Sequence, residues 1–580
     1  MSSNFQFQVQ HHLFDKNISD KIKRDQFVEG LWPLVYIISD DRTHEAYVGE
    51  TTDAVSRMGI HLNTDSKKRL SMVHLVTSEM FNKSATLDIE SNLIRYMSGD
   101  GKYKLLNANI GIANHTYYQK SEVYWSLFKN LWNRLQKEGI AQNPIDWIDN
   151  SDLFKYSPYK SLSHEQIHGI VSILNALLLR ESANVIVEGG AGTGKSIMAV
   201  FLFKLLVTPK EELEFKDFGT YDEVLYDLAI KLKVRLPNPK IALVVPMKSF
   251  RTTLQKVFKQ IKGLKSSMVI GPSEVVKDYY DLIVVDESHR LRQRKNLGTY
   301  FGSFDNINKR MGLSKTSGNE LDWIQQQAKL KVYFFDSNQT IKPSDVNYNS
   351  FEKVINQKDS VKVLLKSQFR VKAGTGYIEY LNSIFNSQIT VTNNIPKFKN
   401  YEFLLFDSFA QMKKVLDKKE NEFGLCRMIA GYSWPWRSNN DSSIYDIEIE
   451  GIKMKWNSVS EDWVNSFNAP FEVGCIHTTQ GYDLNYAGII FGNEITYDFT
   501  LNKIVIRPEK YYDKNGKNSI NNPAELENYI LNIYRTIMLR GIRGTFVYVC
   551  DDNLRKYLKR YIQSFGEYDQ NKFISIAAED

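Results

Sequence analysis

Residues 185–196 read VIVEGGAGTGKS, and this stretch decides the fold. An apolar run leads into a glycine-rich loop and then into a helix, and the pattern GxxxxGK[ST] is matched throughout from Gly189 to Ser196. Glycines allow backbone N–H groups to surround phosphates, and the N-terminus of the helix adds a favourable dipole. The stretch therefore predicts a phosphate-binding loop and, with it, ATP and Mg²⁺ as cofactors.

Each polar position in this loop has an expected role. Lys195 reaches the β- and γ-phosphate oxygens, and the hydroxyl group of Ser196 is a ligand of Mg²⁺. The residues assigned to ATP binding here are Gly189, Gly192, Thr193, Gly194, Lys195 and Ser196. A glycine turn that arises by chance is the alternative.

Apolar strands and amphipathic helices alternate on both sides of the loop, which is typical of parallel α/β sheets. The expected strands are 184–187, 241–245, 282–285 and 332–335, followed by a second set at 361–365, 424–429, 487–491 and 544–549. The fold class is therefore α/β. Two parallel lobes are expected, at 163–346 and 347–580.

A carboxylate pair, Asp286 and Glu287, ends the apolar run 282–285. Asp286 can hold the Mg²⁺ shell, and Glu287 can polarise the attacking water. Taken alone, such a pair is often a solvated turn. Because it follows a complete phosphate loop, we interpret it as the hydrolytic pair.

Four further residues are weaker candidates for the nucleotide site. Gln166 can read adenine through its amide, or it is an ordinary helix-terminal glutamine behind the Ser163 cap. Gln339 ends another apolar run and can sense the γ-phosphate. Arg370 and Arg540 are candidate arginine fingers, although most arginines are surface solubilisers.

The order of these motifs along the chain indicates a resemblance to a known family. Residues 477–481, HTTQG, precede Arg540 as they do in superfamily 1 helicases, and Gln480 and Gly481 are assigned to the ATP site on this basis. Residues 163–580 resemble the Schlafen-group-three-like DNA/RNA helicase family through the phrases at 156–162, 368–374, 430–436 and 534–536. The resemblance implies two RecA-like lobes, the first of which binds ATP, and DNA or RNA as partner.

Residues 1–120 read as a separate α+β unit that resembles the GIY-YIG nuclease domain. The resemblance rests on Val35-Tyr36-Ile37, Tyr47-Val48-Gly49, Arg57, His61, Glu90 and Asn107. It implies that Tyr36, Tyr47, Arg57 and His61 are catalytic, and that Glu90, on an exposed helix face, holds one divalent cation such as Mg²⁺. Arg57 and His61 are spaced i and i+4, so they share one helix face.

Two observations keep an alternative open for this unit. Val35 stands where the family has glycine, and strand tyrosines usually serve packing. A degenerate DNA-binding domain is therefore the other interpretation. Residues 121–162, with a helix near 124–136 and a loop at 146–160, are expected to form a bridge.

The length, net charge and cysteine count of the chain exclude few classes of protein. The 580 residues carry a net charge of +7, which permits a basic groove for nucleic acid without requiring one. Three cysteines, no signal-peptide pattern and no apolar run long enough to span a bilayer indicate a cytoplasmic protein with free thiols and no membrane partner. The basic stretches 67–69 and 290–295 contact nucleic acid or are ordinary charged surface.

Taken together, the sequence predicts an ATP-dependent nucleic-acid motor, a helicase or translocase, joined to a metal-dependent endonuclease. By analogy with other nuclease–motor fusions, we expect a role in defence against phage. The alternative is an ATP-gated switch that binds nucleic acid without unwinding it and carries a degenerate nuclease domain.

Overall fold

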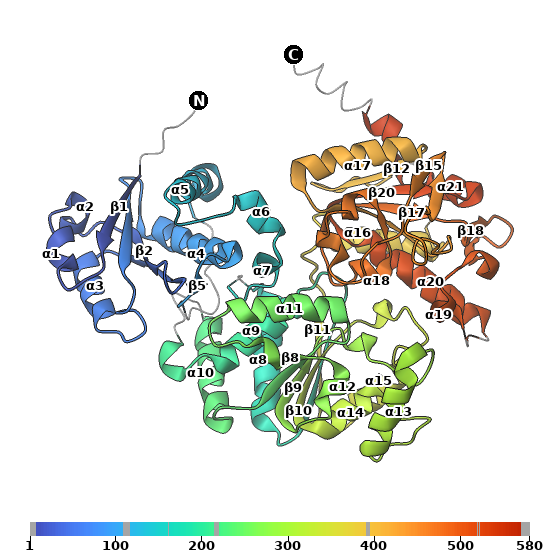
Figure 1. The fold of residues 1–580 in the computed structure, drawn as a ribbon, viewed down its shortest axis with the longest axis horizontal. Coiled ribbons are helices and arrows are strands. Elements are labelled where there is room, and N and C mark those ends of the chain that lie inside the picture. Colours follow the sequence, from blue (N-terminus) through green and yellow to red (C-terminus); the bar gives the residue numbers. More distant parts are fainter. Residues whose placement is uncertain are drawn as a thin grey trace. The chain divides into compact units, whose positions relative to one another are not determined.

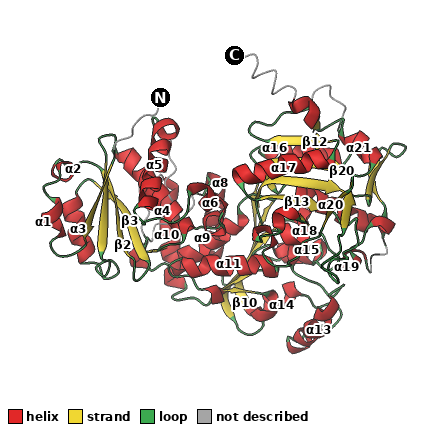
Figure 2. Cartoon of the chain, turned by 45° about the horizontal axis from the view of Figure 1, so that its top comes forward, coloured by secondary structure: helices red, strands yellow, loops and turns green. Residues whose placement is uncertain are grey.

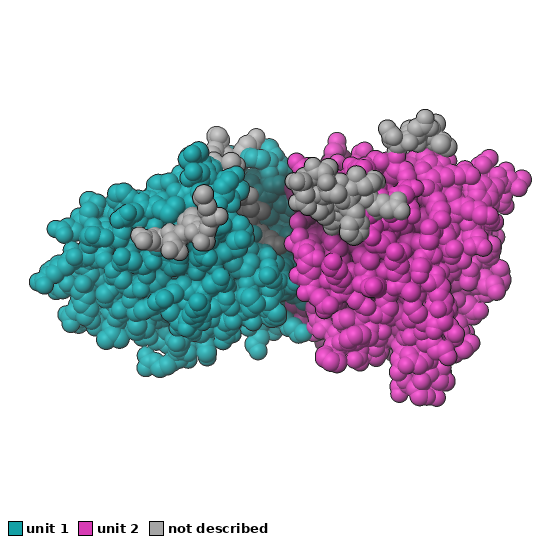
Figure 3. All heavy atoms as spheres, turned by 90° about the horizontal axis from the view of Figure 1, so that it is seen from above, with its two compact units in different colours: residues 1–178, 196–238, 254–269 teal, residues 179–195, 239–253, 270–580 magenta. Residues whose placement is uncertain are grey.

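A computed structural model describes residues 7–107, 117–159, 162–213, 220–389, 395–518, 520 and 522–569. Lys160 and Ser161, within the phrase at 156–162, lie outside these residues. The chain divides into two compact units (Figure 3). One comprises residues 1–178, 196–238 and 254–269, and the other 179–195, 239–253 and 270–580.

The first unit begins with a five-stranded sheet of order β1-β4-β2-β3-β5 (Figure 1). Its strands are β1 Gln8–Leu13, β2 Leu34–Asp40, β3 Glu45–Thr51, β4 Met72–Thr77 and β5 Lys104–Leu105. The apolar runs predicted β2 and β3. The sequence analysis missed β1 because its sequence, QVQHHL, is polar, as suits a strand at the edge of a sheet.

Alternation along β2 gives this sheet two buried faces. Leu34, Tyr36 and Ile38 pack with residues from α1 Ile18–Ile22, α2 Gln26–Glu29 and α3 Ala54–Leu62. Val35 and Ile37 point the other way, toward α4 Lys83–Asp100 and α5 Trp125–Lys137. The helices thus sandwich the sheet (Figure 1).

The expected bridge is part of this core. Five α5 side chains that are almost fully buried belong to the same cluster as Val35 and Ile37, namely Leu127, Phe128, Leu131, Trp132 and Leu135. The expected loop at 146–160 contains two short helices, α6 Ile145–Asn150 and α7 Asp152–Lys155, whose Ile148 and Phe154 join that cluster. The structure therefore corrects both the loop and the separation of the helices from the N-terminal sheet.

The helices that follow are α8 His164–Leu179, α9 Lys195–Val207, α10 Thr220–Arg235 and α11 Lys248–Gln260. Both helices and strands follow from α8 onward, and Figure 2 distinguishes them by colour. Cys426 and Cys475 are buried and Cys550 is half-buried, and all three are free thiols. Within the described ranges, no helix has the length and apolar character needed to cross a bilayer.

A six-stranded sheet of order β11-β6-β10-β9-β7-β8 carries the phosphate loop. Its strands are β6 Ala183–Gly189, β7 Ile241–Val244, β8 Val269–Ile270, β9 Tyr280–Val285, β10 Ala328–Phe335 and β11 Ser360–Leu365. The described pairings of β11, β6, β10, β9 and β7 are parallel. The sequence analysis placed β11 in the second set of strands, but β11 pairs with β6, so the change of sheet falls after residue 365.

The short helices of this region are α12 Pro272–Val275, α13 Phe301–Arg310, α14 Glu320–Gln327 and α15 Tyr348–Ile355. The second parallel sheet has the order β16-β13-β17-β20-β12-β21. Its strands are β12 Glu402–Phe406, β13 Cys426–Ala430, β16 Val473–Gly474, β17 Leu484–Phe491, β20 Gly541–Val549 and β21 Gln563–Ser564. Two antiparallel pairs accompany it, β14 Ile447–Ile449 with β15 Ile452–Met454, and β18 Ile495–Asp498 with β19 Lys503–Ile506.

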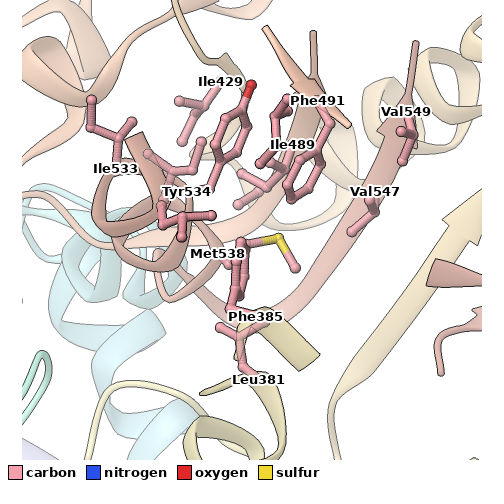
Figure 4. Packing of buried hydrophobic residues seen from close by; sticks show 14 of the residues in the cluster. Leu381, Phe385, Ile429, Ile489, Phe491, Ile533, Tyr534, Met538, Val547 and Val549 are labelled. Atoms are coloured by element: carbon pink, nitrogen blue, oxygen red, sulfur yellow. The ribbon is translucent and has the colours of Figure 1, made fainter. Parts of the chain in front are cut away.

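Helices α16 Thr375–Phe385, α17 Phe409–Phe423, α18 Ile476–Thr479, α19 Lys514–Lys517, α20 Pro523–Met538 and α21 Asp552–Leu558 complete this part. One face of the second sheet is covered by α16 and α20 (Figure 4), where Phe491 and Tyr534 stack at 4.3 Å. The mixed α/β class with two parallel sheets is the predicted one.

Candidate active sites

The phosphate loop connects β6 to α9. Gly192 and Gly194 have φ angles of +80° and +83°, a conformation that glycine adopts readily. A Cβ atom at Gly192 would lie 2.6 Å from the Cβ of Arg370, so this position also lacks room for a side chain. The hydroxyl of Thr193 donates to the carbonyl of Gly190 over 3.0 Å, which closes the loop.

The ammonium group of Lys195 lies against this loop. Its Nζ donates to the carbonyl oxygens of Gly189 at 2.6 Å and Gly190 at 2.8 Å, and it lies 3.8 Å from Asp336 Oδ2. Asp336 also accepts a bond of 2.6 Å from Gln339 Nε2. A lysine, a carboxylate and the expected phosphate sensor are thus connected. The sequence analysis did not assign Asp336 a role, although it ends an apolar run in the same way as Asp286.

The predicted hydrolytic pair, Asp286 and Glu287, follows β9, and β9 pairs with β10, the strand that leads to Asp336. Asp286 is fully buried, and its Oδ1 accepts the backbone N–H of Glu287 at 2.9 Å. Glu287 has a φ of +51°, a strained conformation for a residue with a side chain. Strained backbone conformations cluster at functional sites, and they persist only where the surrounding structure imposes them.

His289 is the partner of Glu287 that the sequence analysis did not identify. Its Nε2 lies 3.0 Å from Glu287 Oε2, and the imidazole is fully buried. Burial acts to raise the pKa of Glu287, but the hydrogen bond and charge of His289, with the positive charges of Lys195 and Arg540, outweigh it and lower the pKa. The carboxyl group is therefore ionised at neutral pH.

Both candidate arginine fingers lie in the second unit with the loop. The backbone N–H of Phe369 donates to the carbonyl of Gly192 at 2.9 Å, so the segment that carries Arg370 is tied to the loop. Arg370 Nε pairs with Asp483 Oδ1. Arg540 is 1% exposed and donates to the carbonyl of Tyr482 at 3.4 Å.

Gln480 and Gly481 come from the HTTQG motif. The side chain of Gln480 is 2% exposed, and neither its Oε1 nor its Nε2 has a hydrogen-bond partner among the residues that the structure describes. A buried amide in this state costs free energy, which a polar ligand would offset. Gly481 has a φ of +89° and lies beside Phe250.

The remaining two residues of the predicted nucleotide site belong to the first unit. Gln166 Oε1 accepts the N–H of Ser163 at 2.9 Å, while Ser163 Oγ accepts the N–H of Gln166 at 3.2 Å. This reciprocal pair is a capping box at the start of α8, which is the alternative weighed for Gln166. Ser196 is half-buried in the first turn of α9.

Four of the expected nuclease residues, Tyr36, Tyr47, Arg57 and His61, come together on the α3 side of the N-terminal sheet. Tyr36 Oη lies 2.7 Å from His61 Nε2, and Arg57 Nε donates to Tyr36 Oη at 3.2 Å. The ring centroid of Tyr47 lies 5.0 Å from that of His61 and 6.3 Å from that of Tyr36. Burial raises the pKa of Tyr36 and outweighs the opposing effect of Arg57, so the phenol is neutral.

Local packing explains two sequence features of this site. A Cβ atom at Gly49 would lie 2.2 Å from Tyr36 Oη, because the two residues face each other across β2 and β3. The tyrosine therefore requires the glycine. Val35 is buried in the cluster on the opposite face, where its side chain is part of the core.

Glu90 differs from the expectation of an exposed helix face, because it is 3% exposed on α4. Its negative charge is one of the influences that raise the pKa of Tyr36. Asn107 holds the end of this unit in place, since its amide accepts the N–H of Val48 at 3.0 Å and donates to its carbonyl at 2.8 Å. This bonding gives Asn107 a structural role.

The donor chemistry fits Mg²⁺. Ser196 and Asp286 in one predicted site and Glu90 in the other supply oxygen ligands, which this cation prefers. Across the described ranges, no group of three or more His, Cys, Asp and Glu side chains is arranged to hold a metal. Sites with few protein ligands suit Mg²⁺, because it keeps waters and substrate phosphate oxygens in its shell.

The basic stretch 290–295 is engaged with other residues of the protein. Arg290 pairs with Asp345, and Arg294 donates to both carboxylate oxygens of Asp305, at 2.6 and 2.9 Å. Lys295 lies 3.6 Å from Glu525. These ion pairs favour the alternative of an ordinary charged surface over a stripe that contacts nucleic acid.

Comparison with known proteins identifies the family of the motor core. A 27% identical protein of Saccharomyces cerevisiae, the uncharacterized protein YPL245W, aligns over 415 residues, which are 66% of this chain and 85% of the yeast protein. Two solved structures are also similar. The arterivirus nonstructural protein 10 (helicase) in complex with DNA has 13% identity and a TM-score of 0.27, over 67% of this chain and 65% of that chain. The Pif1 helicase from Bacteroides in complex with ADP-AlF3 and ssDNA has 12% identity and a TM-score of 0.24, over 72% and 98%.

The family model described as Schlafen group 3, DNA/RNA helicase domain, matches residues 182–551, more than half of the chain. This range includes the phosphate loop, the hydrolytic pair and both candidate arginine fingers. The chain therefore belongs to the Schlafen group 3 DNA/RNA helicase domain family.

Proposed function

We propose that this protein is an ATP-dependent nucleic-acid motor, a helicase or translocase, that also cleaves nucleic acid through its N-terminal domain. The observation that carries the motor half is the placement of Lys195, Asp286 and Asp336 at the carboxyl ends of three neighbouring parallel strands. Ligands bind at this edge in open parallel α/β sheets.

In the motor, Glu287 is the proposed base. It is ionised at neutral pH, and its carboxylate polarises the water that attacks the γ-phosphate. Lys195 exchanges its loop carbonyls for phosphate oxygens, while Arg370 and Arg540 supply positive charge to the transition state. Ser196 and Asp286 would hold Mg²⁺, which would supply positive charge to balance the phosphates.

The nuclease half rests on the contact between Tyr36 and His61. The Tyr36 phenol can accept the proton of the attacking water while passing its own proton to His61 Nε2, 2.7 Å away. Arg57 stabilises the negative phosphate, and Glu90 would hold one divalent cation, which supplies Lewis-acid stabilisation of the leaving oxygen. This arrangement supports a metal-dependent phosphodiesterase more than a degenerate binding domain.

DNA is the proposed partner, with RNA as the second possibility. The decisive experiment incubates the purified protein with supercoiled plasmid and Mg²⁺, with and without ATP, and follows phosphate release and nicking together. Phosphate release together with plasmid nicking would support both the motor and the nuclease proposals. Phosphate release that DNA stimulates, without nicking or strand separation, would favour the ATP-gated switch.

Defence against phage is the biological setting that we attach to this proposal. A bacterial strain that expresses the protein should reduce phage plaque counts, and Lys195→Ala or Glu90→Gln should restore them. Equal plaque counts with and without the protein would remove this setting while leaving the biochemical proposal intact.

A further inference from the structure

We propose that Lys67 is a phosphate-binding residue of the N-terminal site, and that it holds the nucleic-acid backbone beside the bond to be cut. This inference rests on the proposed nuclease function. It concerns a residue outside the predicted catalytic set, in the basic stretch 67–69.

The position of its ammonium group is the first observation. Lys67 Nζ lies 3.7 Å from the centroid of the Tyr47 ring, a cation–π contact. That ring lies 5.0 Å from the His61 ring, and His61 contacts Tyr36. The positive charge is therefore held at the aromatic cluster where the cleavage chemistry is proposed.

The backbone around Lys67 is the second observation. Two hydrogen bonds connect the residue to the end of α3, the helix that carries Arg57 and His61, and a third joins it to Leu70. Thr64 N donates to His61 O at 3.1 Å, Lys67 N donates to Thr64 O at 2.9 Å, and Leu70 N donates to Lys67 O at 3.0 Å. Leu70 is 2% exposed and anchors the turn in the core. Lys67 is thus placed by the turn that follows α3, the helix that carries Arg57 and His61.

The neighbouring cations provide the contrast. Lys68 pairs with Asp65 at 2.5 Å, and Arg69 pairs with Glu45 at 2.8 Å. Both side chains are more than half exposed. Lys68 and Arg69 thus extend to carboxylates, whereas the Lys67 ammonium lies over Tyr47, in the cluster where Arg57 donates to Tyr36 Oη.

The test uses the full chain with the variants Lys67→Met, Lys67→Arg and, as matched control, Lys68→Met. Methionine keeps an unbranched apolar stem against Tyr47 and removes the charge, and arginine keeps the charge. The probe is a fluorescein-labelled DNA duplex. Its dissociation constant is measured in Glu90→Gln proteins over a range of KCl concentrations, and kcat and KM for cleavage are measured with Glu90 intact.

We expect Lys67→Met to lower kcat/KM about 10-fold and to reduce the slope of log affinity against log salt by about one, with Lys68→Met unchanged and Lys67→Arg near wild type. If the unaltered protein cleaves DNA and Lys67→Met matches Lys68→Met in both measurements, the inference is wrong and the nuclease proposal stands. If the unaltered protein does not cleave, the nuclease proposal fails. The salt slope then decides whether Lys67 binds phosphate. A lowered melting temperature with an unchanged slope would overturn the inference in favour of a packing role.

Discussion

At the scale of single residues, the nucleotide site depends on charges that hold one another in place. Lys195 is buried 3.8 Å from Asp336, and the half-buried Glu287 lies 3.0 Å from His289, so each charge has a partner. A buried charge without a partner costs free energy, so removal of one member of a pair destabilises the other. This dependence leads to two predictions.

The first prediction concerns Lys195 and Glu287. Lys195→Ala should weaken nucleotide binding as well as turnover, because it removes the phosphate contact. Glu287→Gln should retain nucleotide binding and lower kcat by roughly 10²–10³-fold, because an amide cannot accept the proton of water. Fluorescent-nucleotide titration and phosphate release measure the two effects, with the exposed Glu509→Gln as control. Wild-type hydrolysis by Glu287→Gln would show that another group acts as base.

The second prediction concerns pH. The pKa of Glu287 is lowered although burial acts to raise it, and His289 is the largest lowering influence. In His289→Gln, that influence is lost while burial remains, so the Glu287 pKa should rise and the acid limb of the kcat/KM profile should move to higher pH. The profile is measured only where circular dichroism shows folded protein. An acid limb at the wild-type pH would mean that His289 does not tune this carboxyl.

At the scale of elements, the sequence predicted the strands that carry the sites better than their surroundings. Strand β6 ends at Gly189, and β9 and β10 are followed by Asp286 and Asp336. The apolar runs of these strands are visible without tertiary information. The polar edge strand β1 and the role of α5 were not visible, because they depend on what each element packs against. His289 was not predicted for the same reason, because its contact with Glu287 depends on the left-handed backbone conformation of Glu287.

The packing of α5 gives the third prediction. Leu131 is fully buried in the N-terminal core, so Leu131→Ala should lower the free energy of unfolding of this region by about 3 kcal/mol. Leu179, which is 81% exposed, is the matched control, and Leu179→Ala should change stability little. Urea denaturation followed by fluorescence measures both. Equal midpoints for the two variants would contradict the assignment of α5 to the core.

The edge strand β1 gives the fourth prediction. His74 on β4 contacts His11 on β1, with 2.8 Å between the Nδ1 atoms, and its pKa is lowered by burial and then by His11 to about 4, although Asp41 acts to raise it. The folded state therefore binds fewer protons than the unfolded state between pH 6.5 and about 4.

Stability should consequently fall as pH drops through that window, by on the order of 3 kcal/mol from this group. His74→Gln should reduce the loss, and unfolding midpoints at several pH values measure it. The same pH dependence in His74→Gln and wild type would assign the effect to other groups.

At the scale of the whole molecule, the two sets of proposed catalytic residues share no member. Glu90→Gln should abolish cleavage and leave basal ATP hydrolysis within about twofold, because no motor motif includes residues of the N-terminal sheet. Gln is preferred to Ala since Glu90 is buried and its truncation would leave a cavity. Cleavage that persists in Glu90→Gln would place any nuclease activity elsewhere.

The variant Lys195→Ala distinguishes two ways in which ATP binding can be coupled to cleavage. If Lys195→Ala still cleaves at full rate, the motor only delivers the nuclease to its target. If cleavage disappears, ATP binding gates the nuclease. Plasmid nicking at saturating protein concentration distinguishes these modes.

The position of Lys195 also affects how nucleotide affinity should be understood. Two of its three N–H donors are bonded to the carbonyls of Gly189 and Gly190, so these bonds compete with contacts from the ammonium to phosphate oxygens. Binding is therefore an exchange equilibrium, in which the measured dissociation constant reports the difference between internal and external partners. A stopped-flow trace should accordingly show an encounter step that depends on nucleotide concentration, followed by a step that does not. Only the second step would reflect the side chain changing partners.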